Sequence, residues 1–394
     1  MSLPLSPETA TAAVVWGALI LGLILGAAGQ ASRFCVRGAI ADWYLFGGRG
    51  RMLAWVLVVA VAAAGTQLLI ALGLFDATRS LPWSSRFAVL SYGVGGLMFG
   101  YGMVLAAGCP QRSLVKAGAG NLRAIVTLLV AALAAQMTLR GVFGELRSNT
   151  LDPWALQLAT PQDLGTLLSR WLPGSADGLR AVMLLALLTL AGTWVWRHRR
   201  HMAPGQWVGS MVIGLLVPAA WLLTGWIGHL PEHPETLEPA WQGTQSRAPE
   251  GLTFTAPMAH VLDLLTLWSD KNATASFGVM LTVGVLFGSF LSAKWRGEFR
   301  VESFANAGEL RSHLVGGLLM GIGGVTAAGC SVGQGVTGLS MLSGGAVIAV
   351  LGIVAGSLLA LRAQAARAER VRRDCAADGA VSDRPLTELA HPIR

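Results

Sequence analysis

Nine long apolar stretches dominate this sequence and leave little freedom for its fold. They lie at 12–30, 52–75, 87–108, 122–139, 181–196, 206–228, 275–292, 312–329 and 343–361. The hydrocarbon core of a bilayer is about 30 Å thick, and a helix needs about 20 apolar residues to cross it. Inside lipid every backbone polar group must be hydrogen-bonded, so such stretches form helices there. The sequence therefore predicts an all-α polytopic membrane protein with about nine transmembrane helices.

The composition excludes the soluble alternatives. Apolar residues make up 53% of the 394 residues and charged residues only 13%, whereas about 25% of the residues in a typical soluble domain are charged. A soluble enzyme or a nucleic-acid-binding protein is therefore excluded, in spite of the net charge of +8. The first 30 residues contain no Lys or Arg. The first stretch thus lacks the basic region of a cleaved signal peptide and is expected to remain as a membrane helix.

The distribution of basic residues predicts the orientation in the membrane. The odd-numbered connections and the start of the C-terminal tail contain 19 Lys and Arg residues when Arg123, at the edge of the fourth stretch, is included, whereas the N-terminus and the even-numbered connections contain eight. Cytoplasmic loops carry the excess of Lys and Arg in membrane proteins. We therefore expect the N-terminus on the outer side of the membrane and the C-terminus in the cytoplasm.

A gapless internal repeat links the third and eighth stretches. Residues 95–109 and 316–330 read GGLMFGYGMVLAAGC and GGLLMGIGGVTAAGC, and ten of their 15 positions are identical. With nine helices, the third and eighth run in opposite directions, so the repeat has inverted topology. Transporters built in this way bind substrate near the bilayer midplane. We expect one transmembrane domain over 1–361, with repeat halves at roughly 12–142 and 206–361, and a polar, disordered tail over 362–394.

Each copy of the repeat ends in a sequence that does not suit a continuous membrane helix. Pro110 follows Cys109 and cannot continue a helix with full hydrogen bonding, and the glycine-rich GCSVGQGVTG contains Cys330. Irregular backbone at membrane depth is tolerated only inside protein or beside a water-filled cavity. We therefore predict a helix break at each cysteine, followed by a short re-entrant helix.

Three cysteines are candidates for contact with a substrate. Cys109 and Cys330 are equivalent in the repeat, and Cys35 lies in a basic segment with Arg37, whereas Cys375 in the tail is expected to have no role. Thiolates would suit a soft metal, and thiol exchange would need a resolving cysteine, but no metal-binding cluster or neighbouring cysteine supports either chemistry. A series of weak sites for a polarisable anion fits better, because conduction requires weak binding. This reading requires protonated thiols, since a thiolate would repel an anion.

Four polar residues near these thiols are further candidates for substrate contact: Arg37, Arg112, Lys116 and Gln334. Arg112 and Lys116 lie near the inferred cytoplasmic end, where they would either attract an anion or simply fix the topology. Gln334 either lines the path or makes an interhelical hydrogen bond. We predict no catalytic residue, no metal site and no cofactor. The sequence has no GxxxxGKS or GxxxxGKT motif for nucleotide phosphates, so transport is expected to be passive or coupled to an ion or to cytoplasmic consumption.

Four short motifs, taken together, are specific. They are SRFCVRGAI at 32–40, AAGCPQ at 106–111, AAGCSVGQGVTG at 327–338 and GEFR at 297–300. With them most of 15–360 resembles the YeeE/YedE family of sulfur-transport membrane proteins. The resemblance implies a bacterial inner-membrane importer of thiosulfate, or of a related sulfur or selenium compound. It implies that the anion passes along Cys35, Cys109 and Cys330 by transient hydrogen bonds to their thiols, and that a TusA-like cytoplasmic sulfur-carrier protein is a partner.

The sequence thus predicts a transporter of a small sulfur oxyanion in the lipid bilayer, with thiosulfate as the leading substrate, and not an enzyme. Three alternatives stay open. A selenium-compound transporter would use the same fold and path. A membrane sulfurtransferase or redox protein would carry sulfur covalently, as a persulfide on Cys109 or Cys330. A structural subunit of an oxidoreductase complex would require a permanent partner.

Overall fold

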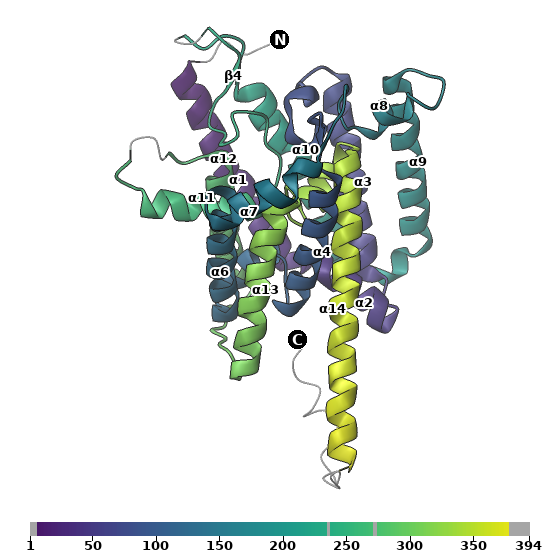
Figure 1. Ribbon diagram of the computed structural model, residues 1–394, viewed down its shortest axis with the longest axis vertical. Helices are drawn as coiled ribbons and strands as arrows, with labels where there is room; N and C mark the ends of the chain where they lie inside the picture. The colour runs from purple at the N-terminus through teal and green to yellow at the C-terminus, as the bar shows by residue number, and fades with distance from the viewer. Residues whose placement is uncertain (1–5, 235–236, 271–273, 378–394) are drawn as a thin grey trace.

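The computed structural model describes residues 6–234, 237–270 and 274–377, and most of them are helical (Figure 1). The α-helices are α1 (Pro7–Ser32), α2 (Val36–Phe46), α3 (Gly50–Ala71), α4 (Val89–Leu105), α5 (Pro110–Gly118), α6 (Leu122–Arg140), α7 (Val142–Thr150), α8 (Leu164–Leu168), α9 (Ala176–Arg197), α10 (Pro204–Leu222), α11 (Thr255–Thr266), α12 (Phe277–Trp295), α13 (Ala307–Thr326) and α14 (Gly344–Ala377). The predicted all-α class is confirmed.

Short elements complete the fold. The 3-10 turns are η1 (Ala77–Arg79), η2 (Leu81–Trp83), η3 (Asp152–Trp154) and η4 (Arg199–His201), and the π-helical turns are η5 (Leu223–Ile227) and η6 (Gly333–Gly338). Two antiparallel two-stranded ribbons pair β1 (Arg86–Phe87) with β2 (Leu156–Gln157) and β3 (His229–Leu230) with β4 (Ala240–Trp241). Both ribbons lie in connections between membrane helices.

Eight helical segments of the described chain are long and apolar enough to span a membrane. They are α1 with α2, α3, α4 with α5, α6, α9, α10 with η5, α12, and α14. The remaining predicted stretch, 312–329, corresponds to α13. This helix has 20 residues, but Glu309, Arg311 and His313 in its first two turns lower its hydropathy. It nevertheless packs along both α4 and α6.

The two repeat helices, α4 and α13, cross in opposite directions. A Cβ atom on Gly95 would lie 2.8 Å from the carbonyl oxygen of Gly323, and a Cβ atom on Gly316 would lie 2.7 Å from that of Gly102. Gly316 and Gly323 are the repeat equivalents of Gly95 and Gly102, 221 positions later. The contact is therefore reciprocal, as an inverted repeat requires. The glycines let the two backbones touch.

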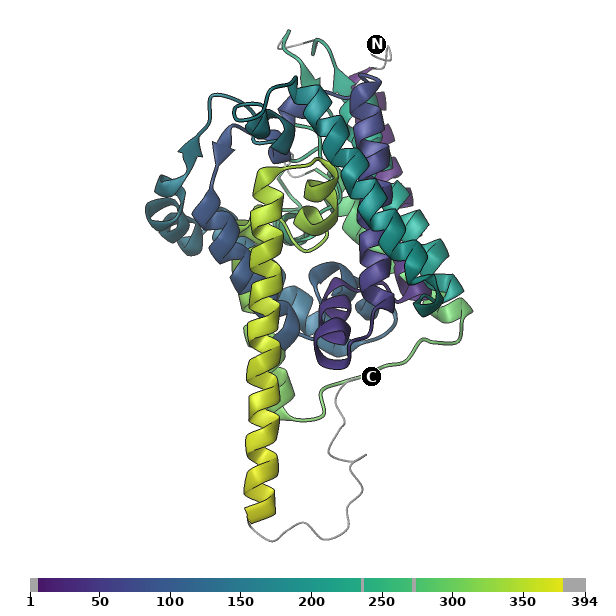
Figure 2. The same ribbon diagram turned by 90° about the vertical axis from the view of Figure 1, so that its right-hand side faces the viewer.

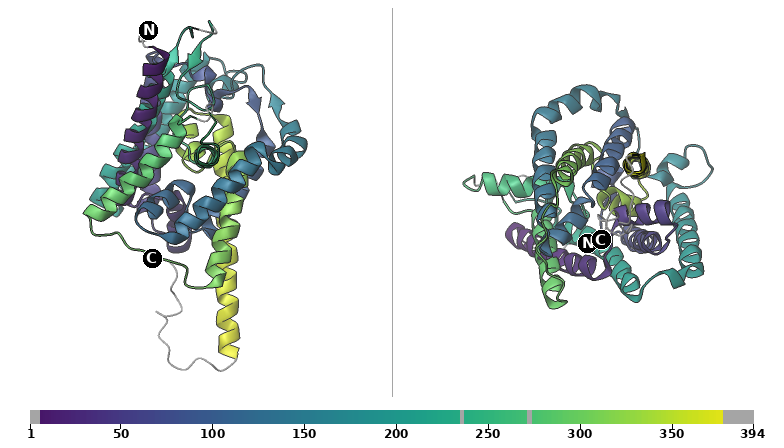
Figure 3. Two further views of the ribbon diagram at one scale, coloured as in Figure 1. Left: turned by 90° about the vertical axis from the view of Figure 1, so that its left-hand side faces the viewer. Right: turned by 90° about the horizontal axis from the view of Figure 1, so that it is seen from below.

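The neighbours of α4 and α13 follow the same symmetry. Gly100 of α4 faces the carbonyl of Ile353 in α14, and its equivalent Gly321 in α13 faces the carbonyl of Ala131 in α6. Outside this group, α1 packs along α12 and α3 packs along α10, while α1 and α10 also touch each other. Figure 3 shows α1 and α12 side by side on one flank. The contacts thus relate α1 to α10, α3 to α12, α4 to α13 and α6 to α14.

The start of α1 and the end of α14 lie at opposite ends of the molecule, called here the upper and lower ends (Figure 1). Helix α9 packs on α3 at the periphery. The connection that holds α7, η3, β2 and α8 lies at the upper end, where Leu164 N donates to Leu342 O and Gly344 N donates to Gln162 O. These bonds fix the start of α14. The exact bounds of the repeat halves, 12–142 and 206–361, remain a prediction.

The C-terminal tail differs from the expectation. Helix α14 does not end near 361 but continues to Ala377 and protrudes below the body (Figure 2). The prediction of a disordered tail is therefore wrong for 362–377, and 378–394 lie outside the described residues. Ala and Arg, which favour helices, are abundant here, and Glu369 and Arg373 form an ion pair one turn apart, at 4.0 Å. Polarity alone was a poor guide, because a polar helix can extend from a membrane span into water.

Candidate functional site

Both predicted helix breaks are present, with the same backbone geometry. Helix α4 ends at Leu105, and Ala107 has a φ of 52° before the chain reaches Cys109 and enters α5. Helix α13 ends at Thr326, and Ala328 has a φ of 53° before the chain reaches Cys330 and the turn η6. Left-handed conformations are uncommon for residues other than glycine. Their recurrence at equivalent alanines shows that the two breaks are copies of one structure.

Two of the predicted site residues hold these breaks in shape. The ammonium group of Lys116 donates to the carbonyl of Ala107 at 2.8 Å. The amide of Gln334 donates to the carbonyl of Ala328 at 3.1 Å, as well as to Ala327. Ala107 and Ala328 are repeat equivalents, so different side chains satisfy the same carbonyl in the two halves. Carbonyls at helix ends need such partners.

The three thiols lie at the starts of short helical segments. Cys330 is fully buried and its sulfur accepts a hydrogen bond from Gly333 N at 3.3 Å. Cys35 is half-buried and its sulfur accepts from Gly38 N, also at 3.3 Å. Cys109 is 1% exposed and occupies the N-cap position of α5, without a side-chain capping bond. It lies close enough to both Cys35 and Cys330 for charges on the three to interact. The structure therefore places the three cysteines around one region.

Two uncharged polar side chains, those of Ser331 and Gln111, are buried next to the thiols, each 1% exposed. Ser331 lies within hydrogen-bonding reach of the Cys109 thiol. The amide of Gln111, in the first turn of α5, has no hydrogen-bond partner within the described ranges. Buried polar groups are almost always hydrogen-bonded, and each exception needs an explanation. Neither residue is among the predicted site residues, although both lie within the cysteine motifs, at 106–111 and 327–338.

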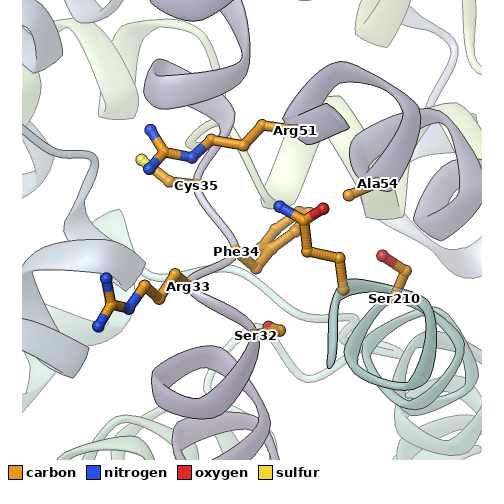
Figure 4. Close-up of a pocket in the computed structure, with 8 residues that line it drawn as sticks. Ser32, Arg33, Phe34, Cys35, Arg51, Ala54 and Ser210 are labelled. Carbon is orange, nitrogen blue, oxygen red and sulfur yellow. The ribbon is translucent and has the colours of Figure 1, made fainter. Parts of the chain in front are cut away.

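Cations gather at the lower side of this region. Arg112 donates to the carbonyl of Gly29 at the end of α1, at 3.2 Å. Arg51 forms an ion pair with Asp42 at 3.3 Å, and Figure 4 shows its guanidinium beside the Cys35 thiol. The Nε atom of Arg37 is buried and has no partner in the part of the chain that the structure describes. Arg51 is not among the predicted site residues, because in the sequence it resembles the other basic residues between the first two apolar stretches.

A surface pocket reaches Cys35 from the lower end. It is lined by Ser32, Arg33, Phe34, Cys35, Arg51, Ala54, Gln206 and Ser210 (Figure 4). Cys35 is thus the thiol nearest to solvent, while the other two are closed off. Among the described residues no group of three or more His, Cys, Asp and Glu side chains could hold a metal ion.

A second pocket, of about 340 Å³, opens at the upper end. Its lining includes Phe75, Asp76, Arg79, Gly225, His229 and Trp241. Phe75 stacks on the buried Trp221, with ring centroids 5.2 Å apart. Burial lowers the pKa of His229, although Asp76 opposes the shift. None of the three thiols lines this upper pocket.

The comparison with known proteins places this site in a family. The model of the family described as Sulphur transport matches residues 31–359, which contain all three thiols and both breaks. The chain belongs to the Sulphur transport family. The family is the one that the sequence motifs had indicated. The eight apolar helices found among the described residues agree with a multi-pass membrane protein.

Three relatives illustrate the similarity within the Sulphur transport family. The thiosulfate transporter TsuA of Escherichia coli is 27% identical over 368 residues, which cover 88% of this chain and 94% of the relative. A protein of the same name from Spirochaeta thermophila is 25% identical over 342 residues, with 84% and 93% covered. The probable transporter YedE of Escherichia coli is 27% identical over 188 residues, with 48% and 43% covered.

Proposed function

We propose that this protein imports thiosulfate, or a closely related small sulfur oxyanion, across the bacterial inner membrane. The observation that carries the proposal is the pair of buried thiols, Cys109 and Cys330, at matching helix breaks in a member of the Sulphur transport family. Relatives named thiosulfate transporter align over most of both chains. They favour thiosulfate over a selenium compound.

The thiols are arranged to donate hydrogen bonds. The sulfur atoms of Cys35 and Cys330 each accept a bond from a backbone N–H, which leaves the S–H proton free for an anion. A thiol is a weak donor with a polarisable sulfur, so it binds a soft anion weakly. A succession of weak sites lets an ion advance. The thiols must remain protonated while the anion passes, because a thiolate would repel it.

The hydroxyl of Ser331, beside the Cys109 thiol, and the unpartnered amide of Gln111 supply further neutral donors around Cys109. Lys116 and Gln334 contribute by holding the two breaks in shape. Arg112, with Arg37 and Arg51 beyond it, draws the anion toward the lower end. In this proposal the lower end faces the cytoplasm and the N-terminus lies in the periplasm.

The transported anion leaves through the pocket at Cys35 and is consumed in the cytoplasm. A sulfur-carrier protein similar to TusA is the partner that we propose for that step, on the strength of the family resemblance. The protein itself acts as a transporter and forms no covalent intermediate with sulfur.

Uptake by purified protein in liposomes tests the proposal without help from partners. We expect the wild-type protein to accumulate labelled thiosulfate and Cys330→Ala to lose at least about 90% of that uptake. Cys375→Ala, at a position in the protruding part of α14, is the matched control and should transport normally. Each variant is compared at equal reconstituted amount.

Other results would contradict specific parts of the proposal. Wild-type uptake by Cys330→Ala would remove the thiol path. A persulfide found by mass spectrometry on Cys109 or Cys330 after exposure to thiosulfate would favour a sulfurtransferase. Uptake of selenite or selenosulfate without uptake of thiosulfate would replace the substrate.

A further inference from the structure

The inverted symmetry gives the short helix α2 a counterpart in the upper half. Because α1 corresponds to α10 and α3 to α12, the helix between each pair must correspond as well. Helix α2 lies between α1 and α3, and α11 lies between α10 and α12. Phe34 lies two residues before α2 and Phe254 lies directly before α11, at an offset of 220, and both are buried, at 5% and 0% exposure. Thr255 therefore follows Phe254 as Cys35 follows Phe34.

The surroundings of Thr255 agree with this equivalence. A Cβ atom on Gly324, near the end of α13, would lie 2.5 Å from the Thr255 hydroxyl oxygen. Thr253 lies in the same way against Gly333, at 2.7 Å from its hydroxyl oxygen. Gly333 is the residue whose N–H bonds the Cys330 sulfur. The segment that carries Thr255 thus borders the Cys330 break.

The hydroxyl of Thr255 is buried, at 1% exposure, and lacks a hydrogen-bond partner among the residues that the structure describes. Threonines within membrane helices usually bond the carbonyl one turn earlier, as Thr282 does to Gly278 at 2.8 Å. Thr255 is the first residue of α11, so no preceding helical carbonyl is available to it. A buried hydroxyl without a partner is costly and is expected where a ligand completes it.

We infer that Thr255 is a substrate-contact residue at the upper side of Cys330, the counterpart of Cys35 on the lower side of Cys109. Its hydroxyl donates a hydrogen bond to an oxygen atom of the anion before the anion reaches Cys330. The inference rests on the proposed function. It implies that the anion meets a hydroxyl first and a thiol last, so that the two ends of the path are chemically different. A hydroxyl is the stronger donor and favours the oxygen atoms of the anion.

The test measures binding of small anions to purified protein by thermal stabilisation, over a panel of thiosulfate, sulfite, sulfate and selenite. The variants are Thr255→Val, which keeps the shape and removes the hydroxyl, and Thr255→Ser, which keeps the hydroxyl. Thr282→Val is the matched control, because its hydroxyl is buried but satisfied within its own helix. We expect Thr255→Val to weaken binding of the anion that stabilises wild type by about tenfold, with near wild-type binding by Thr255→Ser and Thr282→Val.

Unchanged binding by Thr255→Val, or an equal loss in Thr282→Val, would overturn the role of Thr255. Stabilisation of wild type by selenite or sulfate but not by thiosulfate would overturn the proposed substrate. The role of Thr255 would then be tested by whether Thr255→Val weakens binding of that other anion. A wild-type protein that none of the four anions stabilises would overturn both.

Discussion

The two helix breaks share a backbone but differ in charge. At Cys109 the chain enters α5, which carries Arg112 and Lys116, whereas η6 after Cys330 carries no charged residue. The equivalent carbonyl accepts a hydrogen bond from the ammonium group of Lys116 in one half and from the amide of Gln334 in the other. The inverted repeat therefore fixes the shape of the path, and the side chains give it a direction. In the proposed function, the anion meets an uncharged break at Cys330 and is attracted by the cations that follow Cys109.

The largest expected effect comes from breaking the crossing of α4 and α13 that both halves share. Gly95→Ala and Gly316→Ala each force a methyl group onto the backbone of the opposite helix, so we expect a loss of about 1–3 kcal/mol of stability in each. Thermal unfolding in detergent measures it. Gly192→Ala in α9 is the control, because a Cβ atom there meets nothing within 4 Å. A large loss in only one of the two variants would contradict the symmetry.

Removing one thiol at a time compares the two breaks directly. We expect Cys109→Ala and Cys330→Ala to reduce thiosulfate uptake by similar factors, about tenfold or more, because in the proposed path each anion passes both sites. Neither change should lower the melting temperature by more than a few degrees, since a small side chain replaces a small side chain. Uptake that depends on one thiol only would mean that the breaks have different roles.

Removing a charge near Cys109 tests how far the two breaks differ in electrostatics. Arg112→Gln should reduce the rate of uptake about threefold to tenfold, and the reduction should shrink at high salt because the attraction is electrostatic. The relative rates for thiosulfate and sulfite should stay unchanged. A change in substrate preference would show that Arg112 recognises the anion and does not merely attract it.

The hydrogen bond from Lys116 to the Ala107 carbonyl can be tested with a neutral donor. Lys116→Gln introduces the residue type that makes the equivalent bond at the other break, while Lys116→Met removes the donor. We expect Lys116→Met to cost about 1 kcal/mol of stability and Lys116→Gln to recover part of it. Equal stability of the two variants would show that the bond to Ala107 contributes nothing.

The smallest effect is a pH dependence in the turn that precedes Gly251. Burial raises the pKa of Glu250 above its ordinary value of 4.5, although bonds from Ser246 oppose the shift. A carboxyl with a raised pKa stabilises the fold below pH 4.5, and this contribution is lost as the pH rises through the folded pKa. Glu250→Gln should therefore unfold at a temperature that depends less on pH between pH 4.5 and 7. An unchanged pH profile would contradict this account.

Much of the fold could be predicted from the sequence, because hydropathy and glycine spacing are properties of short segments of the chain. The membrane helices, the break at Cys109 and the break at Cys330 could all be located from composition and from Pro110. The continuation of α14 to Ala377 could not, because polar residues serve equally in a tail or in a helix that leaves the membrane.

The candidate site was located only in part. The sequence indicated the cysteines, because a repeated cysteine at a helix break is unusual. Ser331, Arg51 and Thr255 gave no such signal. A serine or threonine in an apolar segment normally bonds its own helix, and only the tertiary structure shows which hydroxyl has lost that partner.

The sequence by itself determined that this chain spans a membrane, that it contains an inverted repeat and that the repeat ends at two cysteines. These properties depend on hydrophobicity and on identical residues, which can be recognised without knowledge of tertiary contacts. Tertiary structure decided which side chains surround those thiols, because α1, α5, α11 and α13 bring together residues that lie far apart in the chain. It also decided which side chain bonds the carbonyl at each break, Lys116 in one half and Gln334 in the other, because both bonds depend on how the chain folds back on itself.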